Sequence, residues 1–114
     1  MRKTIKSFGY AAVGIGYALS GRNFRIQSAI GAIGLALAYY LHIARTEWLF
    51  IISAIGFVLA LEATNTALEE VCNKFHPESH PHIALIKDLA AGAVLIASLT
   101  ALTIGILIFW PKLF

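Results

Sequence analysis

The chain has 114 residues, enough for one domain, and 59% of them are hydrophobic while only 13% are charged. A soluble domain of this size needs a polar exterior, because its surface is large relative to its volume. We therefore expect an integral membrane protein. The formal net charge of +3 is too small and too local to indicate nucleic acid, and it fits contact with anionic lipid headgroups.

The first 20 residues predict an amphipathic helix that lies in the membrane surface. Apolar residues recur there at helical spacing, with basic residues elsewhere around the helix. A frayed basic tail is the alternative, because several glycines weaken the helix. A cleaved signal peptide is not expected, since polar and glycine residues interrupt the apolar sequence of residues 7–23.

Three apolar runs predict an all-α membrane protein with three transmembrane helices, contained in residues 26–43, 48–75 and 84–110. The first and third runs are near or above the roughly 20 residues that a crossing needs. Pro111 is expected to mark the end of the third helix. Small residues recur every four positions on the first and third spans, which favours close helix packing and self-association.

The second apolar run is short, because it begins at Trp48 and stops at Glu62. We expect this helix to continue through Glu62, which places the carboxylate below the membrane surface. The distribution of lysine and arginine puts the N-terminus and residues 62–88 on the cytoplasmic side. A transporter or proton path through Glu62 is disfavoured, because the outer halves of the spans are almost wholly apolar.

A polar stripe follows this run and carries the candidate chemistry. At 100° per residue, Glu62, Asn65, Thr66, Glu69 and Asn73 lie on one face of a helix. Ionisable groups at membrane depth are costly and indicate function by default. Glu62 suits a general base beside a lipid, and Glu69, about 10 Å nearer to water, suits a Mg²⁺ ligand. The alternative is that the stripe only joins helices through hydrogen bonds.

Two further features lie on the same predicted side. Lys87 and Asp88 stand at the start of the third span, and lysine is a usual partner of phosphate; ordinary snorkelling is the alternative. The segment 76–82 holds three histidines and two prolines, which we interpret as a turn with solvated histidines rather than a zinc site. The sequence has no GxxxxGK[ST] loop and no protein-kinase signature.

Four stretches carry a resemblance to a known family: Arg-Asn-Phe-Arg-Ile at 22–26, Leu-Glu-Ala-Thr-Asn-Thr-Ala-Leu-Glu at 61–69, Pro-Glu-Ser-His at 77–80, and Lys-Asp-Leu-Ala-Ala-Gly-Ala-Val-Leu at 87–95. With them, nearly the whole chain resembles the small prokaryotic diacylglycerol kinase and undecaprenol kinase family. The first stretch and the C-terminal Ile-Phe-Trp-Pro-Lys look more like the undecaprenol kinase branch.

The resemblance implies a homotrimer of three-span subunits, with shared active sites that face the cytoplasm of a prokaryote. It implies transfer of the ATP γ-phosphoryl group to a lipid hydroxyl with Mg²⁺. Undecaprenol is the expected substrate. Diacylglycerol is the alternative substrate, and a non-catalytic membrane assembly protein is the alternative function.

The resemblance also implies roles for individual residues, carried over by position. Glu62 would be the catalytic proton acceptor, Glu69 a metal ligand and Asn65 a supporting residue. The expected ATP-binding residues are Tyr10, Glu69, Glu78, Ser79, His80, Lys87 and Asp88. The expected lipid-binding residues are Lys3, Asn23, Phe24, Arg25, Gln27 and Glu62.

Two positions depart from the family pattern. The family commonly has a metal-binding glutamate just before the stretch 22–26, where this chain has Ser20 and Gly21. It also tends to have aspartate where this chain has Asn73. The departures imply weaker metal binding, a substitute such as Glu70 or solvent, or lost activity. Phosphoryl transfer depends mainly on positioning and charge neutralisation, so one missing ligand need not abolish it.

Overall fold

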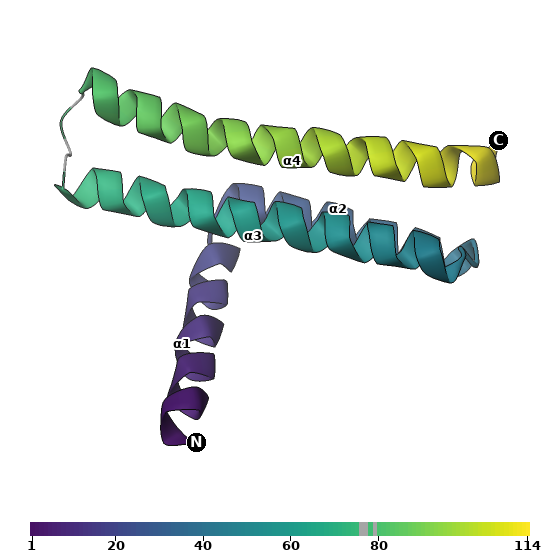
Figure 1. Ribbon diagram of the computed structural model, residues 1–114, viewed down its shortest axis with the longest axis horizontal. Helices are drawn as coiled ribbons and strands as arrows, with labels where there is room; N and C mark the ends of the chain where they lie inside the picture. The colour runs from purple at the N-terminus through teal and green to yellow at the C-terminus, as the bar shows by residue number, and fades with distance from the viewer. Residues whose placement is uncertain (76–77, 79) are drawn as a thin grey trace.

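The computed structural model describes residues 1–75, 78 and 80–114, and this part of the chain is helical almost throughout. Its helices are α1 (Arg2–Leu19), α2 (Arg22–Tyr40), α3 (Arg45–Phe75) and α4 (Pro81–Leu113). The helices α2, α3 and α4 lie side by side along the long axis, and α1 projects crosswise from them (Figure 1). The all-helical fold confirms that part of the sequence prediction.

A short turn separates α1 from α2 and redirects the chain. The amide groups of Ser20 and Gly21 donate to the carbonyls of Tyr17 and Ala18, both at 3.0 Å. Within α1 only Ala18 is buried, and the large apolar side chains of this helix are exposed. Such exposure is expected of a helix that meets lipid or another subunit, and the membrane-surface location of α1 stays a prediction.

Two helices of the described chain, α3 and α4, are long and apolar enough to cross a membrane. The helix α2 has 19 residues and opens with Arg22, Asn23 and Arg25, so its crossing stays a prediction. It ends before Ile43, because His42 takes a left-handed conformation with φ 51°. That conformation breaks the helix.

The helix α4 differs from the expected range at both ends. It begins at Pro81, in the first turn, where the missing N–H of proline costs nothing. The expectation that Pro111 ends the helix is wrong, because α4 runs through it to Leu113. Proline fixes φ near the helical value and removes one hydrogen bond, which the last turn tolerates.

A hydrophobic core cluster lies at the end of the helices farthest from the α3–α4 connection. The cluster joins Ala38, Ile43, Ile51 and Ile108. At the same end the Lys112 ammonium lies 3.1 Å from the Glu47 carboxylate, pairing the start of α3 with the end of α4. This arrangement leaves the opposite end, where the polar stripe lies, less enclosed.

Candidate active site

The stripe is carried by one continuous helix, because α3 passes through Glu62 without a break and ends at Phe75. Burial decreases along it: Glu62 is 5% exposed and Asn65 is 8% exposed, whereas Glu69 and Asn73 are exposed. The stripe therefore leads from a buried carboxylate to an accessible one. That gradient suits a reaction between a membrane-dissolved substrate and a water-soluble one.

The Glu62 side chain accepts a hydrogen bond from α2, and its backbone carbonyl accepts one from within α3. The side-chain amide of Gln27, on α2, donates to its Oε2 at 3.2 Å. The Thr66 hydroxyl donates to its backbone carbonyl at 3.1 Å. A buried carboxylate without a partner would be strongly unfavourable, so Gln27 stabilises Glu62 and also fixes the orientation of its oxygens. The structure thus brings together two residues that the sequence assigned to lipid binding and catalysis.

Asn65 links the buried and the exposed halves of the stripe. Its Nδ2 donates to Glu69 Oε1 at 3.2 Å. Its Oδ1 is buried and accepts no hydrogen bond from the described part of the chain. A buried oxygen without a partner is uncommon, and this one lies beside a carboxylate.

These oxygens bear on the expected Mg²⁺. Residues 1–75, 78 and 80–114 contain no group of three His, Cys, Asp or Glu that could enclose a metal ion. Mg²⁺, however, is usually held by one or two carboxylates, water and substrate phosphates rather than by a protein cage. The Glu69 carboxylate and the Asn65 oxygen, which has no partner among residues 1–75, 78 and 80–114, fit that open type of site.

Lys87 and Asp88, two of the nucleotide residues expected from the sequence, lie in the first turns of α4, and His80 precedes it. Lys87 donates to Asn73 Oδ1 at 2.7 Å, so α4 brings a cation to the exposed end of the stripe. The His80 imidazole accepts from the His82 amide at 3.0 Å and caps α4. Glu78 and Asp88 are exposed. Ser79, like His76 and Pro77, lies outside the described residues.

Several expected residues are not brought to the stripe by the described contacts. Lys3 and Tyr10 are exposed on α1, and within the described part of the chain neither side chain hydrogen-bonds to α3. Asn23 and Arg25 are exposed at the start of α2, while Phe24 is buried. Their roles in binding stay predictions.

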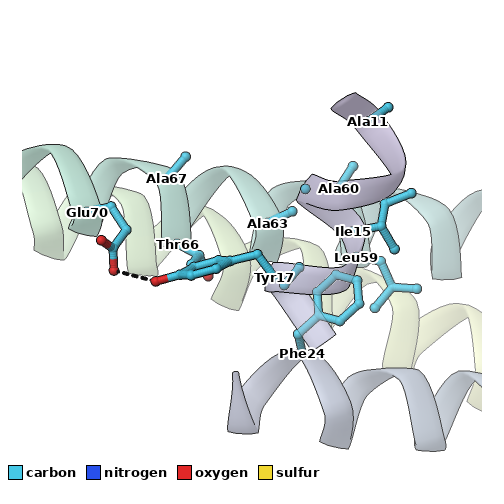
Figure 2. A pocket seen from close by; sticks show the side chains of 12 residues that line it. Ala11, Ile15, Tyr17, Phe24, Leu59, Ala60, Ala63, Thr66, Ala67 and Glu70 are labelled. Carbon is cyan, nitrogen blue, oxygen red and sulfur yellow. Dashed lines mark hydrogen bonds between the residues drawn. The ribbon is translucent and has the colours of Figure 1, made fainter. Parts of the chain in front are cut away.

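A contact that the sequence did not reveal joins α1 to α3. The Tyr17 hydroxyl donates to Glu70 Oε1 at 3.0 Å (Figure 2). This hydrogen bond, with the negative charge of Glu70, raises the pKa of Tyr17 and keeps the phenol protonated. Glu70 lies beside the stripe in sequence, but its partner is 53 residues away, and no helical periodicity indicates such a pair.

The same two residues border a cavity of about 670 Å³ between α1, the start of α2 and α3. We call it the α1–α3 cavity. Its volume falls in the range of small-molecule sites. Most of its wall consists of small or apolar side chains, among them Ala11, Ala18, Leu59, Ala60, Ala63 and Ala67. Thr66 belongs to this wall as well as to the stripe.

Comparisons with known proteins place the chain in a family. Residues 9–109 match the family described as prokaryotic diacylglycerol kinase. The chain is 35% identical to an undecaprenol kinase of Bacillus subtilis, over 99% of this chain and 93% of that protein. It is 38% identical to a diacylglycerol kinase of Synechocystis, over 94% of this chain and 62% of that protein. A diacylglycerol kinase of Escherichia coli is 27% identical, over 95% of this chain and 89% of that protein.

Proposed function

Because the chain belongs to the prokaryotic diacylglycerol kinase family, we propose that it transfers the γ-phosphoryl group of ATP to the hydroxyl of undecaprenol. The chain is thus a lipid kinase, and undecaprenol is the substrate we propose for it. End-to-end similarity to the Bacillus subtilis undecaprenol kinase supports that choice. Diacylglycerol is the competing substrate, because the Synechocystis relative bears that name.

One observation carries the proposal: Glu62 is a buried carboxylate, oriented by Gln27, at the inner end of a stripe that leads to exposed Glu69. A lipid alcohol reaches such a site from the membrane, and a nucleotide reaches it from water. The depth difference between the two carboxylates therefore matches the two substrates of a lipid kinase.

In the proposed reaction, Glu62 accepts the proton of the lipid hydroxyl as that oxygen attacks the γ-phosphorus, and the bond from the γ-phosphorus to the bridging oxygen breaks to release ADP. Gln27 holds one carboxylate oxygen of Glu62 and leaves the other for the substrate. Lys87, held near the stripe by Asn73, supplies positive charge to the phosphates. Positioning and charge stabilisation of this kind account for most of the catalysis in phosphoryl transfer.

Mg²⁺ would be held by Glu69 with support from Asn65, and when bound it neutralises charge on the phosphate oxygens. Asn65 orients Glu69 through its amide group. Tyr10, Glu78, Ser79, His80 and Asp88 complete the proposed nucleotide site. Lys3, Asn23, Phe24 and Arg25 complete the proposed lipid site.

We further propose three spans, with α2 as the first crossing and α1 as an amphipathic surface helix. The active site then faces the cytoplasm from the prokaryotic inner membrane, in line with the distribution of basic residues. A homotrimer would cover the exposed apolar faces of α2, α3 and α4 and would allow neighbouring subunits to share a site.

The proposal is tested by a lipid-panel phosphorylation assay in mixed micelles. Undecaprenol, diacylglycerol and no lipid are compared with wild type, Glu62→Gln and Glu69→Gln. We expect ATP consumption only with a lipid alcohol, fastest with undecaprenol. Both variants should be impaired, and only Glu69→Gln should respond to raised Mg²⁺. Absence of turnover on every lipid, with no effect of Glu62→Gln, would contradict the proposal.

A further inference from the structure

The α1–α3 cavity is lined by residues of the same turn of α3 that carries the proposed catalytic residue, among them Ala63, the neighbour of Glu62. Thr66 lines the cavity, and its hydroxyl donates to the carbonyl of Glu62 one helical turn away. One turn of four residues is about 6 Å along the helix. A molecule that contacts Ala63 in the cavity would therefore lie at the level of Glu62, and its end near Thr66 would lie about one turn nearer to the exposed end of the stripe.

The chemistry of the cavity selects the kind of molecule. Its wall is apolar except at one edge, where Tyr17, Thr66 and Glu70 meet (Figure 2). A long apolar chain with a single polar end matches this division, since its methylenes contact apolar side chains and its polar end meets hydrogen-bonding groups. A nucleotide does not match it, because its charges would meet an apolar wall and the Glu70 carboxylate.

The position of α1 depends on the polar edge of the cavity. The Tyr17–Glu70 hydrogen bond is the only side-chain hydrogen bond between α1 and another helix in the described part of the chain. Apart from Ala18, α1 is exposed, so few buried contacts hold it against α3. Loss of this bond would free the helix that forms one wall of the cavity.

We propose that Tyr17 and Glu70 are positioning residues that hold α1 against α3 and so close the α1–α3 cavity around the apolar chain of the lipid substrate. This inference rests on the lipid-kinase function proposed above and adds the place where the lipid chain binds. A second copy of the chain is a poorer occupant, because a helix packed into the cavity would bury the exposed Glu70 carboxylate, and burial of a charge is costly.

Steady-state kinetics with lipid and ATP varied separately provide the first test. Tyr17→Phe removes only the hydroxyl, and we expect the KM for lipid to rise about threefold to tenfold, as for loss of one hydrogen bond. The KM for ATP and kcat should stay unchanged. Glu70→Ala should raise the KM for lipid by the same factor, and the double variant should raise it no further than either single variant does. Glu70→Gln keeps an acceptor oxygen and should retain most lipid affinity.

Matched controls separate positioning from general damage. Tyr39→Phe makes the same chemical change on an exposed tyrosine of α2 and should leave all parameters unchanged. Ala63→Phe fills the cavity and should raise the KM for lipid at least as much as Tyr17→Phe. Thr64→Phe, on the exposed face of the same turn, should not. An unchanged lipid KM in Ala63→Phe, or a fall in kcat alone in Tyr17→Phe, would overturn the inference.

A binding test without ATP keeps this inference separate from catalysis. A long-chain alcohol with a photoreactive group in its chain should label residues of α1 and α3 around Ala63 in wild type, and much less in Ala63→Phe. Labelling elsewhere only would overturn the cavity as the lipid site, even if the kinase is active. Labelling here by a protein that phosphorylates no lipid would instead overturn the proposed function.

Discussion

The side-chain amide of Gln27 donates to Oε2 of Glu62 at 3.2 Å and so joins α2 to α3 at the buried end of the polar stripe. A carboxylate at this depth needs a donor, and the described part of the chain provides it from the preceding helix, 35 residues away in sequence. The contact therefore links the packing of α2 to the proposed catalytic function.

Gln27→Leu should leave Glu62 without this donor and should lower kcat by about tenfold, since hydrogen bonds to charged groups contribute roughly 1.5–3 kcal/mol. The measurement is kcat at saturating lipid and ATP. Ser28→Ala, at the neighbouring half-buried position, is the control and should be near wild type. An unchanged kcat in Gln27→Leu would show that Glu62 is oriented by something else.

The fold was largely predictable because helical membrane proteins follow a simple rule: apolar runs of sufficient length form helices. The continuation of α3 beyond Glu62 followed from the absence of proline and glycine, and the structure confirms it. Helix ends were less accurate. The left-handed conformation of His42 and the tolerance of α4 for Pro111 are local backbone features, which the periodicity of apolar residues does not specify.

The site was predictable along one helix but not between helices. Helical spacing placed Glu62, Asn65 and Glu69 on one face, and the Asn65–Glu69 hydrogen bond agrees with that. The pairs Gln27–Glu62 and Tyr17–Glu70 bring distant segments together. Their register depends on how far the helices slide along one another, and a single sequence gives no measure of that.

Metal binding can be tested at Gly21, where the chain lacks the glutamate that the family commonly has. Gly21 caps α2 with φ −80° and ψ 139°, an extended conformation that any residue adopts. Gly21→Glu should supply a second carboxylate and lower the Mg²⁺ concentration for half-maximal activity severalfold. The new Cβ would lie 3.3 Å from the Ala18 carbonyl oxygen, so the backbone of the turn must shift slightly to accept it.

Gly9→Glu serves as its control, because it adds the same charge on α1 with open space around the new Cβ. A Mg²⁺ titration of activity on both variants and wild type makes the comparison. If Gly9→Glu shifts the midpoint as much as Gly21→Glu does, the effect is a general one of negative charge rather than of metal ligation.

The Tyr17 phenol should titrate above its ordinary pKa of 10.0, because the Glu70 hydrogen bond and then its charge favour the protonated form. A raised pKa means that the contact is fully present below pH 10.0 and is lost as pH rises through the raised value. The difference in phenolate absorbance between wild type and Tyr17→Phe reports this titration. Glu70→Gln should lower the titration midpoint of Tyr17 toward the ordinary value. A midpoint identical to that of wild type would show that Glu70 does not contact the phenol.

Close packing of α2 on α3 depends on Gly31. A Cβ at this position would lie 3.0 Å from Cγ2 of Ile55, so the two helices approach closely only because glycine has no side chain. Gly31→Leu should therefore separate them and destabilise the fold by about 1–3 kcal/mol, as overpacking does. The thermal unfolding midpoint in detergent measures this loss.

Gly34→Leu is the control and should lower the unfolding midpoint less, because a Cβ there meets open space. Adding Ile55→Ala to Gly31→Leu removes the group that the leucine meets and should recover part of the midpoint. If the double variant instead loses as much stability as the two single variants combined, the helices separate for a reason other than the contact with Ile55.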